Sequence, residues 1–227
     1  MRDHPRRRVS VQFVALVSVP LLLAACATES HQVVATETVA SAGTPYSGPR
    51  PRLAIGEFQN NSPYMRGMFS SGEDQLGTQA KTILKTHLSQ ANRFTVADRD
   101  NMDQISREAA LSGTAQNVTG AQYVLSGEVT EFGRRTTGDR ELWGIVGRGS
   151  EQTAYSKVSV NVIDVRNSEV VYSVQGAGEY ALSDREVIGF GSTSGYDSTL
   201  NGKVLNLSIT DAVNKLVSAL ESGAWGR

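Results

Sequence analysis

The chain has 227 residues, a length that fits one domain with short additions. Hydrophobic residues make up 39% of it, which is enough for one core and excludes a chain that is disordered throughout. The net charge is −1, so the basic excess of a general nucleic-acid-binding protein is absent. A single cysteine excludes an internal disulfide framework, and no apolar run reaches the ~18 residues of a transmembrane helix. Any membrane attachment is therefore expected through a lipid, an interfacial surface or β-strands.

Residues 1–25 have the pattern of a secretory signal peptide. A basic start is followed by the apolar stretch Val9–Ala25, and the small residues Ala24 and Ala25 come directly before Cys26. The alternative is an N-terminal membrane helix that stays in place. Pro20 disfavours that alternative because proline interrupts a helix near its end.

The segment Leu23–Cys26 resembles the lipobox of bacterial lipoproteins. The resemblance implies cleavage before Cys26, a diacylglyceryl group on its sulfur and a further acyl chain, such as palmitate, on the new amine. Two or more acyl chains would anchor the chain stably. Ala27, where an Asp would signal retention, implies delivery to the outer membrane of a Gram-negative bacterium. The alternative is an ordinary signal peptide with an incidental cysteine.

Cleavage before Cys26 would remove four arginines and one aspartate, which leaves 18 basic and 22 acidic residues and a net charge of about −4. Electrostatic attraction would then add nothing to membrane affinity. Residues 26–51 are rich in Thr, Ser, Ala, Gly and Pro and are expected to form an acylated tether before a domain at 52–227.

The pattern of apolar residues predicts the elements of this domain. Two strands are expected near 52–58 and 94–97, and helices after Asp74 and from Asp100 to Leu111. A strand from Tyr123, a hairpin over 154–180 and a strongly amphipathic helix from Leu205 to Leu220 follow. Gly223 should end that helix, and Trp225 should pack back on the domain. This order predicts an α/β or α+β sandwich in which helices cover a mixed sheet.

Few residues in the sequence indicate catalysis. The chain after Cys26 contains only His31, in the tether, and His87, beside the apolar face of the first helix, where a structural role is expected. A zinc cluster is therefore implausible, and neither a nucleophile elbow nor a nucleotide-binding loop is present. The glycines at 189–195 have the wrong spacing for a dinucleotide fingerprint and indicate a turn. Neither a cofactor nor enzymatic activity is expected.

Several blocks resemble the CsgG family, the curli-secretion channel lipoproteins of the outer membrane, which include HfaB-like relatives. The blocks are Leu53–Phe58, Arg93–Arg99, Gly120–Glu128, Val158–Val165, Ser168–Glu169, Gly195–Tyr196 and Gly223–Trp225. The resemblance implies a periplasmic domain that contributes two β-hairpins to an oligomeric barrel. It also implies a ring of about nine subunits that exports curli-like or adhesin subunits with periplasmic accessory proteins.

The candidate transmembrane hairpins are 131–157 and 174–199. The first is long enough for two strands of ~9–11 residues. Charged residues such as Arg134 and Arg135 crowd it, and a lipid-facing Arg costs ~2–4 kcal/mol at the midplane. The segment Ser183–Glu186 interrupts the alternation of the second hairpin, so the alternative is a pair of exposed periplasmic hairpins.

The loop after the first strand is the candidate channel constriction. In the family, a Tyr and, five residues later, a Phe preceded by an Asn narrow the channel. Tyr64 and Phe69 keep that spacing, whereas Met68 replaces the Asn. Rings of these side chains would form a narrow apolar collar that suits an unfolded polypeptide. Alternatively, Tyr64 and Phe69 cover the first helix.

A second hypothesis from a different class remains open. Lipoproteins similar to LpoB hang from the outer membrane on a tether and activate peptidoglycan synthases as regulatory binding modules. Residues 26–51 also fit that role, although crossing the periplasm would need a longer tether. The segments 131–157 and 174–199 discriminate between the two, because only a channel requires them as paired transmembrane strands.

Overall fold

A computed structural model describes residues 36–64, 74–140, 148–186 and 198–226 and, within them, the side chains of residues 36–64, 74–135, 153–181 and 202–226. The strands are β1 (Arg52–Asn60), β2 (Thr95–Ala97), β3 (Tyr123–Arg140), β4 (Arg148–Asp164) and β5 (Val170–Glu186). The helices are α1 (Gln75–Gln90), α2 (Met102–Leu111) and α3 (Ser198–Glu221). The chain order β-α-β-α-β-β-β-α agrees with the order expected from the sequence.

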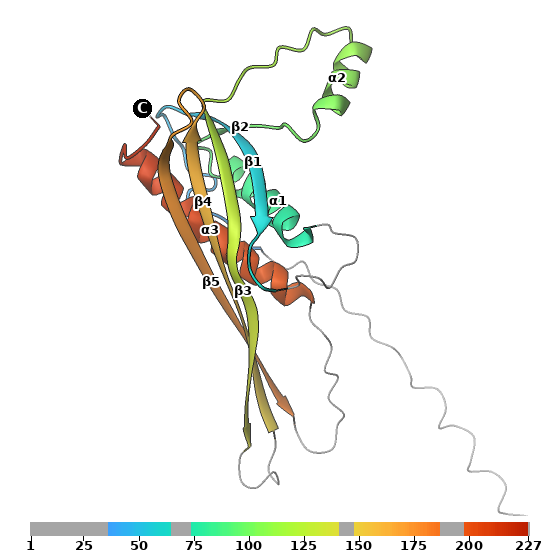
Figure 1. The fold of residues 1–227 in the computed structure, drawn as a ribbon, viewed down its shortest axis with the longest axis vertical. Helices are drawn as coiled ribbons and strands as arrows, with labels where there is room; N and C mark the ends of the chain where they lie inside the picture. Colours follow the sequence, from blue (N-terminus) through green and yellow to red (C-terminus); the bar gives the residue numbers. More distant parts are fainter. Residues whose placement is uncertain (1–35, 65–73, 141–147, 187–197, 227) are drawn as a thin grey trace, which may run out of the picture. The chain divides into compact units, whose positions relative to one another are not determined.

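One five-stranded sheet with the order β2-β1-β3-β4-β5 forms the centre of the domain (Figure 1). Strand β1 pairs in parallel with both β2 and β3. Strands β3, β4 and β5 are joined antiparallel, with the short turn at 165–169 between β4 and β5. The predicted α+β architecture with a mixed sheet is therefore confirmed.

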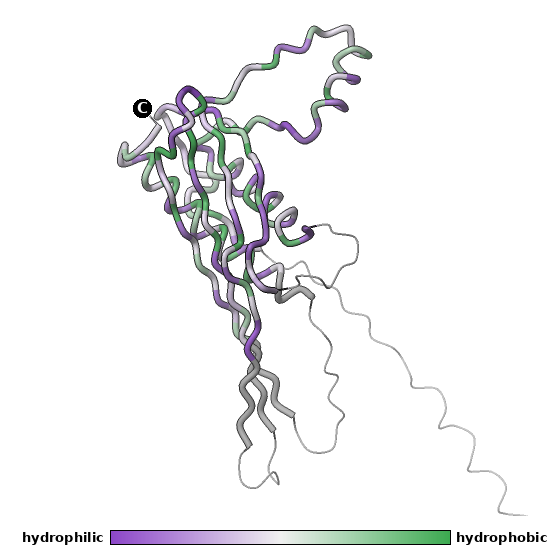
Figure 2. Tube along the Cα trace, in the orientation of Figure 1, coloured by the Kyte–Doolittle hydropathy of each residue, from purple (hydrophilic) through white to green (hydrophobic). Residues whose placement is uncertain are grey.

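Helices α1 and α3 cover one face of the sheet. Asp74 caps α1 by accepting a hydrogen bond from the Gly77 amide, and Leu76, Ala80, Leu84 and Leu88 are buried along one face of the helix. Val158, Val160 and Val162 alternate along β4 toward the same core. Figure 2 shows how hydrophobic and hydrophilic residues are distributed along the trace. The opposite face of the sheet carries mainly polar side chains, except at the end where β4 turns into β5.

Helix α3 packs directly on the backbone of β5. A Cβ atom on Gly176 would overlap the carbonyl oxygen of Ser208, and one on Gly178 would lie 2.7 Å from the Ser208 amide nitrogen. Ser208 is fully buried there, and its hydroxyl lies 3.0 Å from the hydroxyl of Ser156 on β4. The helix runs antiparallel to β5, so the N-terminal end of α3 lies where β5 leaves the core.

The C-terminus packs back on the domain as predicted. Gly223 ends α3 in the left-handed region with φ +73°. Trp225 is 5% exposed, stacks on Phe94 with ring centres 5.9 Å apart and meets the Tyr123 ring edge-on. Its indole Nε1 donates a hydrogen bond to the carbonyl oxygen of Leu216.

Residues 37–51, within the expected tether, form a strap that lies along α3. Val39 is buried in the core, and the Ala40 amide donates to the Asn214 side chain. The Asn206 side chain donates to the carbonyl oxygen of Glu37, whereas Arg93 at the far end donates to the Thr44 carbonyl oxygen and to Glu221. The boundary at residue 52 remains a prediction, and packed residues continue upstream of it.

The close approach of α3 to β5 can be tested with Gly176→Ala. The new methyl group has no room beside Ser208, so α3 must shift, and we expect a loss of about 1–3 kcal/mol in the free energy of unfolding. Gly202→Ala in the same helix is the control, because its Cβ would meet only the Gln79 side chain at 3.6 Å. Urea unfolding should show Gly202→Ala unchanged or more stable. Equal stability of both variants would contradict the packing.

Candidate functional site

A three-stranded ribbon formed by the ends of β3, β4 and β5 extends past the two covering helices (Figure 1). At the level where β3 leaves the edge of β1, Glu131 pairs with Lys157, and Lys157 with Ala177. From there the pairing continues without interruption to Arg140 opposite Arg148 and to Arg148 opposite Glu186. Each strand thus has ten residues from this level to its end: Glu131–Arg140, Arg148–Lys157 and Ala177–Glu186. The first four of each still lie beside the core, because Phe132, Ala154 and Ser156 are buried and Gly178 packs under α3.

Within the core, both outer edges of this ribbon are covered. Strand β1 pairs with β3 as far as Val129, and the Asn61 amide donates to the Val129 carbonyl oxygen. The register between β3 and β4 shifts at that point, between Val129 and Glu131. Beyond it, β3 is an outer strand among the described residues.

Side chains of α3 cover the edge of β5. The Ala177 amide donates to the Asp211 carboxylate at 3.0 Å, and the Lys215 ammonium donates to the Gln175 carbonyl oxygen at 2.8 Å. Asp211 and Lys215 also pair with each other at 2.8 Å. An uncovered strand edge is a template for pairing with another chain. The Asp211–Lys215 pair therefore prevents another strand from pairing with β5 at residues 175–177.

The two ends of the loop between β1 and α1 are held together by one carboxylate. Asp74 accepts a hydrogen bond from the Asn60 amide at 2.6 Å and one from the Gly77 amide at 2.8 Å. Tyr64 is partly buried, and its ring lies 4.8 Å from the ring of Phe132 at the base of the ribbon. This candidate constriction residue is thus placed beside β3, where the ribbon begins.

Met68, Phe69 and Cys26 lie outside the described residues, so their proposed roles stay predictions.

His87 is buried between α1 and α3, and its Nε2 lies 2.8 Å from the Asn206 side-chain oxygen and 3.2 Å from the Thr210 hydroxyl. These contacts fit the structural role expected of it. Within the described ranges, no group of three metal-ligating side chains occurs, and no helix is long and apolar enough to cross a membrane.

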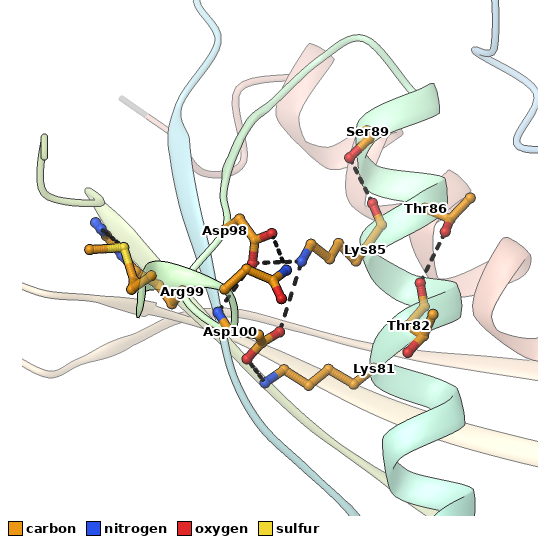
Figure 3. Close-up of polar contacts among 10 residues, drawn as sticks. Lys81, Thr82, Lys85, Thr86, Ser89, Asp98, Arg99 and Asp100 are labelled. Carbon is orange, nitrogen blue, oxygen red and sulfur yellow. Dashed lines mark hydrogen bonds and ion pairs between the residues drawn. The ribbon is translucent and has the colours of Figure 1, made fainter. Parts of the chain in front are cut away.

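A cluster of charged residues ties the segment after β2 to α1 (Figure 3). Lys85 contacts Asp98 at 2.7 Å and Asp100 at 3.9 Å, and Lys81 contacts Asp100 at 2.6 Å. The hydrogen bond from Lys85, followed by that from the Asn101 side chain, lowers the pKa of Asp98 from 3.8 to about 2. We call this cluster the clasp.

Asp164, at the end of β4, is a second carboxylate with a perturbed pKa. Hydrogen bonds from the Arg166 side chain and amide lower the pKa of Asp164 to about 2. A shallow pocket of about 320 Å³ lies beside it, lined by residues 121–123 and 164–166.

The clasp predicts a pH dependence of folding. Because the pKa of Asp98 is lower in the folded chain, its stabilisation is complete above pH 4 and is lost as the pH falls toward 2. Asp98→Asn should therefore lose stability at pH 7 and lose less than the wild type when the pH falls from 4 to 2. Denaturant unfolding at these pH values measures both effects, with Asp103→Asn on the exposed surface of α2 as the control. Parallel pH profiles for Asp98→Asn and wild type would contradict the assignment.

Comparison with solved structures returns proteins of low sequence identity. A PelC dodecamer from Paraburkholderia phytofirmans is 18% identical with a TM-score of 0.33, covering 76% of this chain and 93% of that chain. The lipoprotein GNA1162 from Neisseria meningitidis is 17% identical with a TM-score of 0.37, covering 75% and 99%. The LpoB C-terminal domain from Salmonella enterica is 16% identical with a TM-score of 0.31, covering 60% and 86%.

Sequence comparison gives a much stronger match. The protein NMB1126/NMB1164 of Neisseria meningitidis serogroup B, named as a lipoprotein, is 56% identical over 212 residues. The match covers 93% of this chain and 95% of the relative. Residues 35–227 match the family described as "Curli production assembly/transport component CsgG", and neither name is that of an enzyme. The chain is therefore a member of the CsgG family, related over nearly its full length to an envelope lipoprotein.

Proposed function

We propose that this chain is an acylated outer-membrane subunit whose copies assemble into a channel for curli-like or adhesin subunits. Family membership supports the transport class, and the ribbon of β3, β4 and β5 supports the means of crossing the membrane. Each strand runs ten residues from the level of Glu131, within the ~9–11 that a tilted transmembrane strand needs, and its last six lie beyond the core residues Phe132, Ala154 and Tyr180.

The position of the strap is the observation that carries this proposal. Glu37 contacts Asn206, in the half of α3 that lies over the outgoing end of β5, where a Cβ on Gly178 would meet Val204 and Leu207. The chain toward Cys26 therefore leaves the domain at the end from which the ribbon projects. Ten residues separate Cys26 from Glu37, and the eleven Cα-to-Cα steps between the two reach at most ~40 Å. A lipid at Cys26 would hold this end of the domain, with its ribbon, near the membrane.

The directions of the described strands also explain why a second hairpin is needed. Strands β3 and β5 run in the same direction, because each is antiparallel to β4. If β5 of one copy paired directly with β3 of the next, that contact would be parallel, whereas transmembrane barrels are built from antiparallel strands. A returning strand after β5, within the proposed hairpin 174–199, makes every contact in the ring antiparallel. The sheet order thus favours four strands per subunit in a ring of about nine copies, the number the family resemblance implies.

Charged side chains determine at which depth in the membrane such a ribbon would have to lie. Arg134 and Arg135 are successive residues of β3 and so face opposite sides of the ribbon. One of them faces lipid in a barrel, and the cost falls from ~2–4 kcal/mol at the midplane to ~0–1 near the interfaces. Both are within five residues of Glu131, close to the base of the ribbon. We therefore place the periplasmic interface of the membrane at this level.

The loop between β1 and α1 would line the constriction of this channel. Asp74 fixes both ends of the loop, and Tyr64 packs on Phe132 beside the base of the ribbon. In a ring, copies of this loop lie around the axis, so Tyr64, Met68 and Phe69 can form the apolar collar through which an unfolded substrate passes. The regulatory, LpoB-like alternative requires neither the collar nor membrane-crossing strands.

Mild detergent extraction tests the channel directly. We expect a heat-labile ring far larger than the monomer that conducts ions in planar bilayers, and cleavage of its loops by protease added outside the cell. Phe69→Ala should raise the conductance because the collar widens, whereas Phe69→Tyr should leave it near the wild-type value. A monomeric, non-conducting extract with protected loops would reject the channel and leave the regulatory alternative.

The lipid anchor is tested separately with Cys26→Ala. This substitution should abolish labelling by radioactive palmitate and release the protein from sedimented outer membranes, because no other cysteine is available. Thr28→Ala, two residues further along, should be labelled and sedimented like the wild type. Unchanged labelling of Cys26→Ala would refute the attachment site.

A further inference from the structure

Exposed large hydrophobic side chains gather at two places on the described surface. Of seven such residues, three lie in the segment 98–122 that contains α2 and three at the end of the sheet where β4 turns into β5. The first group is Ile105, Leu111 and Val118, with 40%, 81% and 49% of their surface exposed, and the second is Val165, Val170 and Val171, with 49%, 56% and 38%. Exposed apolar residues that gather in one part of a surface can mark an interaction site, whereas single scattered ones need no explanation.

The second group belongs to a larger apolar patch on the face of the sheet that α1 and α3 leave uncovered. Val124 on β3 pairs with Ile163 on β4, and Ile163 pairs with Val170 on β5. The register shifts there, so Val170 and Val171 both lie opposite Ile163. We call Val124, Ile163, Val165, Val170 and Val171 the sheet-end patch. The shallow pocket at residues 121–123 and 164–166 adjoins it.

The first group belongs to a segment that stands away from the sheet (Figure 1), which we call the α2 lobe, residues 98–122. Helix α2 has no buried residue, although Met102, Ile105 and Ala109 form an apolar stripe along it. Arg99 closes the lobe on itself by donating a hydrogen bond to the Thr119 carbonyl oxygen at 2.9 Å. The lobe thus presents an amphipathic helix whose apolar side lacks a buried contact.

The clasp fixes the N-terminal base of the lobe to α1. Lys81 and Lys85 hold Asp100 and Asp98, at the base of the lobe, on α1, and α1 lies on the face of the sheet opposite the sheet-end patch (Figure 3). The lobe and the patch are two different surfaces of one chain, which is what a head-to-tail ring contact requires. Charged side chains also flank the two surfaces, with Glu108 on the lobe and Arg166 and Glu169 beside the patch.

We propose that the α2 lobe of one copy docks on the sheet-end patch of the next copy, forming the contact between neighbouring subunits at the end of the domain opposite the ribbon. This inference rests on the proposed ring. It adds a second point of attachment to the strand pairing, so the subunits are joined both at the ribbon and at the opposite end of the domain. Burial of the two apolar groups stabilises the contact, and the flanking charged side chains fix its orientation.

Cross-linking between two variants, each with one introduced cysteine in addition to Cys26, tests the contact in the full-length protein. One variant carries Ile105→Cys and the other Val171→Cys, and both are co-expressed and extracted in mild detergent. We expect a disulfide-linked dimer on oxidation, in the assembled fraction only. Arg107→Cys, on the opposite side of α2, with Val171→Cys is the matched control and should give several-fold less dimer. Wild type treated in the same way shows any dimer formed through Cys26.

A second variant tests the energetic role of the lobe. Ile105→Ser with Leu111→Ser should lower the temperature at which the assembly dissociates, while the monomer unfolds as the wild type does, because α2 buries nothing in the monomer. An assembled species without the cross-link would overturn the inference and leave the channel standing. A purely monomeric extract would overturn both.

Discussion

The packing of α3 against β4 and β5 is the contact on which the rest of the structure depends. Gly176 lets the helix approach the backbone of β5, and the buried hydroxyls of Ser156 and Ser208 meet across the interface. This interface fixes the core halves of three long strands, so their register is already set where they pass beyond the helix. The strap, the edge cover of β5 and the position of the C-terminus all depend on the same helix. A ribbon that leaves a rigid base in fixed register can pair with other strands without first having to find its alignment.

Much of the fold could be predicted because its core elements are amphipathic. Leu205, Ile209 and Leu216 repeat at helical spacing, and Val158, Val160 and Val162 alternate, since each set faces the same core. Gly223 and Trp225 could be assigned because the glycine ends the helix and the indole needs a buried partner. The two candidate transmembrane hairpins, 131–157 and 174–199, came instead from the family resemblance.

The parts that sequence reasoning missed depend on partners distant along the chain. Asp211 and Lys215 are four residues apart on the surface of α3, which indicates an ordinary helical ion pair. Only the sheet shows that they also satisfy backbone groups of β5. In the same way, Asp98 and Asp100 look like solvated loop residues until α1 places Lys85 and Lys81 beside them. A helix was expected from Asp100 to Leu111, yet its lack of buried residues could not be foreseen, because the weak apolar stripe fits a core-facing helix equally well.

The strap has a mechanical consequence for an anchored domain. Its hydrogen bonds to α3 follow one another in the same order along both segments, from Glu37 with Asn206 to Ala40 with Asn214, and Thr44 then meets Arg93, which holds Glu221. Tension applied at the N-terminal end therefore acts along the line of these contacts and loads them together in shear, rather than peeling them apart one at a time. The force therefore reaches α3 before it reaches β1, and α3 passes it to β4 and β5, the strands on which it packs.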